Sequence, residues 1–350
     1  MSSPPPVSAA PADSADSPRL SASACALALD IGGTKIAAAV VDVTGTLRGT
    51  ARRPVPAPPA DAVAAGEPSA EAVFGAVRDC AEQALAAAGM TGAELAGIGC
   101  GCAGPMRWPV GEVSPLNIPA WRDFPLRARL GELYADLPVR VHNDGIALAA
   151  GEHWSGAGRG VRNLLAVTVS TGVGGGLVLG DRLLHGGSGN AGHIGHVVVE
   201  ADGPPCPCGG QGCVEAIAAG PHSVRRALAA GWNPAPGEIA DGQALARSAA
   251  AGDAVARAEL VRAGAAVGAG LASCASLLDL DAAVVAGGFA QSGPIFWEAV
   301  GGSFRRHAGL AFARRLRIMP SADPAGGALR GAAAFVLAPD RYGWSDDDPV

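Results

Sequence analysis

One Gly/Pro-rich stretch, residues 189–215, holds the side chains best suited to bind a metal ion. Four of them follow the spacing H-x9-C-x-C-x4-C and are His196, Cys206, Cys208 and Cys213. Three thiolates and one imidazole at such short intervals are typical of a closed, tetrahedral zinc site. A closed site has no open position for a catalytic water, so we expect the ion to hold His193 and Glu215 in position on either side of it. The alternative is a loop whose thiols bind no metal.

A second candidate for chemistry is an aspartate between an expected strand and an expected helix. Residues 138–142 have the pattern of a strand, Asn143-Asp144-Gly145 follows, and residues 146–154 have helical character. An aspartate at the carboxyl end of a strand faces the crevice in which α/β proteins bind ligands. Asp144 could therefore act as a general base towards a bound hydroxyl group. The alternative is that its carboxylate only caps the helix.

Two strand–glycine–strand units are candidates for binding phosphate. The first is Asp30-Ile-Gly-Gly-Thr-Lys35, between expected strands at 26–30 and 36–43. The second is Thr171-Gly-Val-Gly-Gly-Gly176, after an expected strand at 164–170. Backbone amides of such turns can approach a phosphate closely, and a carboxylate at the strand end could hold a metal ion or its water. Either turn alone is an ordinary hairpin, but the repetition suggests that two halves hold one nucleotide between them.

Further candidate ligand-binding residues lie in other turns. Gly287-Gly288-Phe289 follows an expected strand and could contact adenosine. Residues 111–121 form a turn-rich loop in which Asn117 could face a substrate, although Ile118 and Trp121 could simply pack at an edge. The residues expected to bind the nucleotide are Asp30, Gly32, Gly33, Thr34, Lys35, Thr171, Gly172, Gly174, Gly287 and Gly288.

The elements that must position these groups alternate between strands and helices, as in α/β proteins. Besides those named above, strands are expected at 47–55, 95–104, 177–179, 282–285 and 316–319. Helices are expected at 69–88, 124–135, 213–229, 244–250, 255–278, 292–306 and 326–337. Residues 1–24 are mostly Pro, Ala and Ser and are expected to form a disordered leader, and residues 56–68 a Pro/Ala linker.

Size and composition exclude several classes of function. The chain has 350 residues, enough for two lobes, and a net charge of -6 without any Lys/Arg cluster, which argues against nucleic acid as a partner. No uninterrupted apolar run is long enough to span a bilayer, and the leader lacks the features of a signal peptide, so we expect no membrane association. The eight cysteines form no disulfide framework, which favours a reducing, cytoplasmic location.

Taken together, the motifs resemble those of the ROK family of sugar kinases and repressors, within the actin-like ATPase superfamily. They are DIGGTK at 30–35, NDG at 143–145, STGVGGG at 170–176, the metal motif ending at Glu215, and AGGF at 286–289. The resemblance covers about residues 25–338 and implies an α/β, two-lobed actin-like ATPase (ribonuclease H-like) fold. That fold consists of mixed sheets flanked by helices, and the resemblance adds a zinc-binding loop.

The resemblance also implies a division of the chain. A small N-terminal lobe is expected at 25–142, together with a closing helix at 326–338. A large C-terminal lobe is expected at 143–325, including the zinc segment 189–215, and a tail at 339–350. Members of the family often form homodimers, and we expect the same here.

The activity implied by the resemblance is transfer of the γ-phosphoryl group of ATP, with Mg²⁺, to a hexose hydroxyl, usually the 6-hydroxyl. In that scheme Asp144 is the catalytic base and the glycine turns bind the phosphates. Asn143, His196 and Glu215 would contact the sugar, His196 through the ring nitrogen that is not on zinc.

One residue departs from the family pattern. ROK glucokinases usually have glutamate at the position of His193. An imidazole offers one acceptor at most, so the hydroxyl groups that it recognises can differ. His193 remains a candidate substrate-binding residue, although it could merely hydrogen-bond within the wall of the site. The open alternatives are a kinase for N-acetylmannosamine or an amino sugar, polyphosphate as the donor, and a sugar-sensing ROK transcriptional regulator that lacks its DNA-binding domain.

Overall fold

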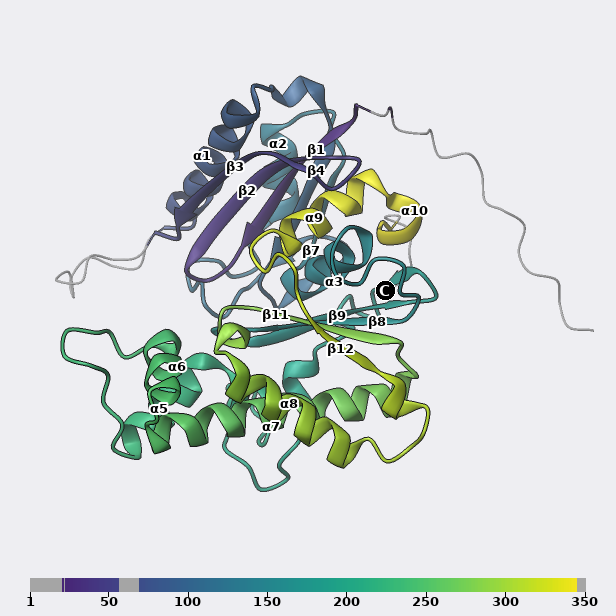
Figure 1. Cartoon of the computed structure of the whole chain (residues 1–350). Coiled ribbons are helices and arrows are strands. Elements are labelled where there is room, and N and C mark those ends of the chain that lie inside the picture. Colours follow the sequence, from purple (N-terminus) through teal and green to yellow (C-terminus); the bar gives the residue numbers. More distant parts are fainter. Residues whose placement is uncertain (1–20, 22, 57–68, 345–350) are drawn as a thin grey trace, which may run out of the picture.

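The framework of the computed structural model is a pair of five-stranded sheets flanked by helices (Figure 1). The structure describes residues 21, 23–56 and 69–344. The expected leader and the expected Pro/Ala linker therefore lie almost entirely outside the described residues.

The first sheet has the strand order β3-β2-β1-β4-β7. Its antiparallel part consists of β1 (Cys25–Ile31), β2 (Lys35–Asp42) and β3 (Leu47–Pro54). On the other side β1 pairs in parallel with β4 (Leu95–Cys102), and β4 pairs in parallel with β7 (Val139–Asn143). The carboxyl ends of β1, β4 and β7 consequently meet at one edge of the sheet.

The second sheet repeats this arrangement with the order β10-β9-β8-β11-β12. The antiparallel strands are β8 (Leu164–Val169), β9 (Val173–Leu179) and β10 (Arg182–Leu184). The parallel strands are β11 (Ala282–Ala286) and β12 (Arg317–Pro320). Each sheet thus contains an antiparallel hairpin with glycine in its turn, as the sequence predicted.

Helices cover the outer faces of both sheets (Figure 1). On the first sheet α1 (Ala70–Ala88) begins after Ser69, whose side-chain oxygen accepts a hydrogen bond from the Ala72 N–H at 3.1 Å. The other helices outside the centre are α2 (Leu126–Leu133), α4 (Val214–Ala218), α5 (Gly220–Ala229), α6 (Gly242–Ala250), α7 (Ala254–Leu278) and α8 (Pro294–His307). Two short strands, β5 (Met106–Arg107) and β6 (Glu112–Val113), form a small separate ribbon.

Two helices, α3 (Asp144–Trp154) and α9 (Gly327–Leu337), cross between the two sheets (Figure 1). α9 packs on the first sheet, and α3 packs on β8 and β9. A Cβ atom added at Gly331 would lie 1.6 Å from the carbonyl oxygen of Ala147, and one at Gly151 would lie 1.9 Å from the carbonyl oxygen of Gly327. Only glycine permits this close approach of the two helices.

The second glycine turn is shorter than the sequence suggested. β9 begins at Val173, so residues 174–176 lie in the strand and pair with residues 166–168. A Cβ atom added at Gly176 would lie 2.7 Å from the carbonyl oxygen of Gly145. Glycine is therefore needed at this position because α3 rests directly on the strand.

The helix expected at 213–229 is in fact two helices, α4 and α5. Between them Ala219 has an extended ψ of 139°. Gly220 donates its N–H to the carbonyl oxygen of Ser170 at 2.9 Å, and the next residue, Pro221, has no N–H to donate. The helical hydrogen-bond ladder therefore stops at this point.

The region expected to be a tail includes folded residues. A short helix, α10 (Pro339–Tyr342), follows α9, and the side chains of Tyr342 and Trp344 are buried. Residues 345–350 lie outside the described part of the chain.

One described helix, α7, is long and apolar enough to cross a membrane by length and composition alone. Buried core helices pass the same test, and α7 packs along α8, α6, α4 and α5. Its apolar character is therefore explained by packing within the fold.

Candidate functional site

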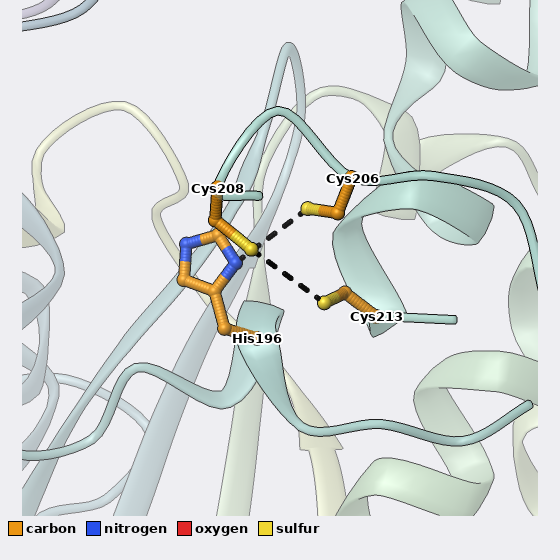
Figure 2. A group of neighbouring side chains, drawn as sticks. All are labelled: His196, Cys206, Cys208 and Cys213. Carbon is orange, nitrogen blue, oxygen red and sulfur yellow. Dashed lines mark hydrogen bonds between the residues drawn. The ribbon is translucent and has the colours of Figure 1, made fainter. Parts of the chain in front are cut away.

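The four predicted metal ligands lie together (Figure 2). The ligand atoms of His196, Cys206, Cys208 and Cys213 are all within 4.8 Å of one another. The Sγ atom of Cys206 is 3.8 Å from Nδ1 of His196, and the Sγ atoms of Cys208 and Cys213 are 3.8 Å apart. Three sulfur atoms and one imidazole nitrogen converging on a common centre match the donor set of a structural zinc site.

Tight turns of the backbone bring these ligands together. His196 ends a single helical turn at Ile194–His196, and Cys213 immediately precedes α4. Gly212 has a φ of 70°, and a Cβ atom added there would lie 1.6 Å from the carbonyl oxygen of Glu200. This glycine is required because a larger residue would prevent the two sides of the loop from meeting.

The metal cluster is connected to the second glycine turn through Glu215. Glu215 is in the first turn of α4, two residues after Cys213. Its Oε2 atom accepts a hydrogen bond from the Val173 N–H at 2.8 Å, at the start of β9. A Cβ atom added at Gly172 would lie 2.8 Å from the same oxygen. The loop thus holds the Glu215 carboxylate directly against the turn.

The candidate base, Asp144, lies at the carboxyl end of β7 as predicted. Asn143 provides the cap of α3, because its Oδ1 atom accepts the Gly145 N–H at 2.9 Å. Asp144 also accepts this N–H, through Oδ1 at 2.8 Å. Because Asn143 serves as the cap residue, capping alone does not explain a carboxylate at position 144.

Three carboxylates converge at this edge of the sheets. Burial, and secondarily the charge of Asp144, raise the pKa of Asp30 to about 6, although Lys35 opposes the shift. Burial also raises the pKa of Asp144, and the charge of Glu215 adds to that effect. The charge of Asp144 acts on Asp30 and that of Glu215 acts on Asp144, so the three carboxylates form one negatively charged group.

The first glycine turn is in contact with the predicted substrate loop. The Gly32 N–H donates to the carbonyl oxygen of Lys35 at 3.0 Å, which closes the turn. A Cβ atom added at Gly33 would lie 2.3 Å from Cγ of Asn117. Asn117, a candidate for sugar contact, therefore lies directly on the turn that is a candidate for phosphate contact.

At three of the candidate glycines a Cβ atom would make only ordinary van der Waals contacts. Such an atom would be no nearer than 3.6 Å to any neighbour at Gly32, 3.5 Å at Gly174 and 3.8 Å at Gly288. Packing inside the protein does not require glycine at these positions. Glycine at these positions is compatible with close approach of a ligand to the backbone.

The remaining nucleotide candidates lie in the three glycine turns. Thr34, Lys35 and Thr171 have exposed side chains at the two turns. Gly287 has a φ of 101°, and a Cβ atom there would lie 2.3 Å from the carbonyl oxygen of Val169. The third turn is therefore held against the end of β8.

His193 lies beside the metal cluster and senses the charge of Glu215. Its ring is stacked on that of His196, with centroids 6.0 Å apart. Its Nε2 atom is buried and has no hydrogen-bond partner among the residues that the structure describes. Burial lowers the pKa of His193, and His196 lowers it further. A neutral imidazole with an unused nitrogen is suited to bind a ligand hydroxyl.

The sequence did not reveal a pair of histidines behind Asn143, of which His142 is fully buried and His185 half-buried. His142 and His185 lie within hydrogen-bonding distance and are surrounded by Trp108 and Trp344. The four residues are far apart in the chain, and the short-range patterns give no signal that they meet.

A cavity of 640 Å³ lies elsewhere, at the opposite end of α3 from Asp144. It is lined by the turn at 44–47, the end of α3, Asp323 and Arg330. None of the predicted site residues lines it, so it is separate from the candidate site.

Comparisons with known proteins agree with the motifs. The ROK family profile matches residues 26–339. A glucokinase of Streptomyces coelicolor is 34% identical over 292 residues, which covers 80% of this chain and 87% of that protein. An N-acetylmannosamine kinase of Escherichia coli O157:H7 is 38% identical over 221 residues, covering 62% of this chain and 66% of that protein.

The fold is also that of solved ROK proteins. A ROK family glucokinase from Streptomyces griseus, solved with glucose and AMPPNP, superposes with a TM-score of 0.75 and 32% identity. The alignment covers 90% of this chain and 99% of that one. The expected two-lobed, actin-like ATPase fold is thus confirmed. Because the ROK family profile spans nearly all of the described residues, the chain belongs to the ROK family.

Proposed function

We propose that this chain, an ATP-dependent sugar kinase of the ROK family, phosphorylates a hexose at its 6-hydroxyl with Asp144 as the general base. The observation that carries the proposal is the convergence of Asp144, Asp30 and Glu215 beside two glycine turns. Phosphoryl transfer depends mainly on positioning and on neutralising charge, and this cleft provides groups for both.

Asp144 acts on the proton of the attacking hydroxyl. As the sugar oxygen forms a bond to the γ-phosphorus of ATP, its proton passes to the Asp144 carboxylate and ADP leaves. Burial raises the pKa of this carboxyl group, which makes it a better proton acceptor than an exposed aspartate. The Gly145 N–H fixes one carboxylate oxygen, Oδ1. The other oxygen remains for the sugar.

We assign the sugar contacts to residues around Asp144. Glu215 uses Oε2 for the Val173 N–H, so its second oxygen is available to a hydroxyl group. His196 turns Nδ1 towards the thiols, which leaves Nε2 for the sugar. Asn117, Asn143 and His193 complete the proposed set.

ATP is assigned to the two glycine turns. Gly32, Gly33, Thr34 and Lys35 would bind its phosphates from one side, and Thr171, Gly172 and Gly174 from the other. Gly287 and Gly288 would contact adenosine. Mg²⁺, when bound, would supply positive charge against the phosphates, and we assign Asp30 to hold that ion or one of its waters.

The Cys/His cluster is proposed to hold a structural Zn²⁺ ion. Its four donors match the ion in type and spacing. Zinc would fix the loop and thereby Glu215, and it takes no part in proton transfer. The proposed lobes are 25–142 with 326–338 and 143–325.

Other properties stand as proposals of the same kind. We propose a homodimer in the cytoplasm with no nucleic-acid partner and no membrane association. The replacement of the usual glutamate by His193 keeps N-acetylmannosamine or an amino sugar as a second candidate substrate. A regulator that only senses sugar would bind it without releasing ADP.

The test is a coupled ADP-release assay with glucose, mannose, N-acetylmannosamine, N-acetylglucosamine and 3-amino-3-deoxyglucose. Asp144→Asn should lower kcat by roughly 10²- to 10⁴-fold with little change in fold. Asp202→Asn, at an exposed position, is the matched control and should keep full activity. An Asp144→Asn enzyme with undiminished turnover would remove the assignment of the base.

A further inference from the structure

Two histidines lie directly behind the proposed catalytic turn and are not used by the mechanism above. His142 is fully buried in β7, immediately before Asn143. His185 follows β10 and opens the loop that leads to His193. Nε2 of His142 is 3.0 Å from Nδ1 of His185. The pair therefore joins the first sheet to the loop that follows β10 of the second sheet.

The hydrogen bonds define which nitrogens carry protons. The Asn143 N–H donates to Nδ1 of His142 at 2.8 Å, so Nδ1 is an acceptor and the proton of this ring lies on Nε2. Nε2 must then donate to Nδ1 of His185. Burial lowers the pKa of His142 well below its ordinary value, and His185 lowers it further, in agreement with a neutral ring.

Aromatic side chains lock the two rings in place. Trp108 stacks on His185 with centroids 4.9 Å apart and on His142 at 5.5 Å. Trp344 approaches both rings edge-on, at 5.1 Å from His142 and 5.5 Å from His185. Rings enclosed in this way have little freedom to rotate away from their hydrogen bonds.

The loop after His185 is fixed by the same cluster. The Ala191 N–H donates to the carbonyl oxygen of His185 at 3.0 Å, which closes the loop. Gly189 has a φ of 74°, and a Cβ atom there would lie 2.4 Å from Cβ of Trp108. The segment leading to His193 is therefore held against Trp108.

Packing alone does not explain imidazoles in this place. Burying polar rings among aromatic side chains costs free energy unless their nitrogens are hydrogen-bonded, and apolar side chains would fill the space without that cost. Here both nitrogens of His142 have partners, and one of them is the backbone of the residue next to Asp144.

We propose that His142 and His185 are positioning residues that fix the Asn143–Asp144 turn and couple it to the loop carrying His193. The chain of contacts runs from His185 to His142, then to the Asn143 N–H, and from Asn143 to the Gly145 N–H in the first turn of α3. The inference rests on the proposed role of Asp144.

The test separates the two hydrogen bonds of His142. In His142→Asn the side-chain oxygen can occupy the place of Nδ1 and accept the Asn143 N–H, but the link to His185 is lost. In His142→Gln the amide nitrogen can occupy the place of Nε2 and donate to His185, but the acceptor for Asn143 is lost. The two variants are similar in polarity, and each retains one bond.

We expect His142→Gln to lower kcat by about 10- to 100-fold, because a small displacement of the base disrupts alignment. His142→Asn should retain most of kcat and raise the sugar KM about 5- to 10-fold, the effect of one lost hydrogen bond. The sugar KM of His185→Asn, which keeps an acceptor near the position of Nδ1, should lie closer to the wild-type value than the sugar KM of His185→Phe. The KM for ATP should be unchanged in all of them.

A double variant, His142→Phe with His185→Phe, keeps the aromatic packing and removes both hydrogen bonds. Full activity in this folded variant, or a kcat of His142→Gln within twofold of wild type, would overturn the inference. If His142→Gln does not fold, the contrast between His185→Asn and His185→Phe in sugar KM decides. Asp144→Asn serves as the reference variant. If Asp144→Asn is active, the proposed catalytic base is wrong. If Asp144→Asn is inactive but His142→Gln is fully active, only the positioning role of the histidines is wrong.

Discussion

Asp30→Asn is the substitution whose effect on stability follows most directly from the site. In the folded protein burial, and secondarily the charge of Asp144, raise the pKa of Asp30 from 3.8 to about 6. This difference corresponds to about 3 kcal/mol against the ionised form in the folded state. The protein therefore holds a carboxylate at a place where its charge is unfavourable, which is common for groups that serve catalysis.

The direction of the pH effect follows from the raised pKa. Because the unfolded chain loses this proton first, the Asp30 contribution to the free energy of unfolding falls between about pH 4 and pH 6 and then stays level. Asparagine resembles the protonated carboxyl group and has no such dependence. Because Asp30 is partly exposed, water weakens this effect, and we expect a gain of about 1 to 3 kcal/mol at pH 7.5 and well under 1 kcal/mol at pH 4.

The assay is urea unfolding of wild type and variant at both pH values, in the absence of nucleotide. ADP release by the variant should be greatly reduced, because Asp30 is proposed to hold Mg²⁺ or its water. A variant that is less stable than wild type at pH 7.5, or an equal difference at the two pH values, would refute the reasoning.

Asp42→Asn is the matched control from the same hairpin. Burial raises the pKa of Asp42, but hydrogen bonds from Thr44, Thr46 and Arg48 lower it by more, so the net shift is downward. The Asp42 contribution to stability is therefore present at neutral pH and is lost as pH falls through its depressed pKa. Its removal should destabilise the protein at pH 7.5, the opposite sign to Asp30→Asn.

Three further predictions concern the metal and the glycines. Elemental analysis should find about one zinc ion per chain, and Cys208→Ser should reduce that content by more than half; a folded wild-type preparation without zinc would contradict the site. Gly331→Ala should lower the free energy of unfolding by about 1–3 kcal/mol, because the backbone of α3 occupies the place of its Cβ atom. Gly75→Ala, on α1 where nothing lies near the new Cβ atom, should raise that free energy by about 0.5–1 kcal/mol. Equal effects of the two substitutions would contradict the close crossing of α3 and α9. Gly33→Ala should raise the sugar KM by displacing the Asn117 side chain, and Gly32→Ala should raise the KM for ATP; an unchanged KM in either variant would remove that residue from its assigned contact.

Local patterns predicted most elements because each is encoded over a few neighbouring residues. Ser69 and Gly89 mark the two ends of α1, and apolar runs mark the strands. The metal motif could be predicted in the same way, because its four ligands lie within 18 residues, from His196 to Cys213. Short-range geometry and residue type suffice for features of this kind.

The errors came from contacts between distant segments. The break at Ala219 depends on Ser170, whose carbonyl oxygen takes the Gly220 N–H. Residues 174–176 belong to a strand because α3 and β8 lie beside them. Neither contact leaves a pattern in the residues around the break or the strand.

The sequence by itself determined which residues could do chemistry: Asp144 after a strand, the glycines of two hairpins, and the Cys/His set. Tertiary structure decided how those residues act on one another. Asp30 has a raised pKa because parallel pairing and helix packing enclose it near Asp144, and Glu215 meets Val173 because the metal loop folds back onto β9. The pairing of His142 with His185 depends on two sheets meeting. Such long-range proximity arises from the packing of the whole chain, and no local stretch of sequence specifies it.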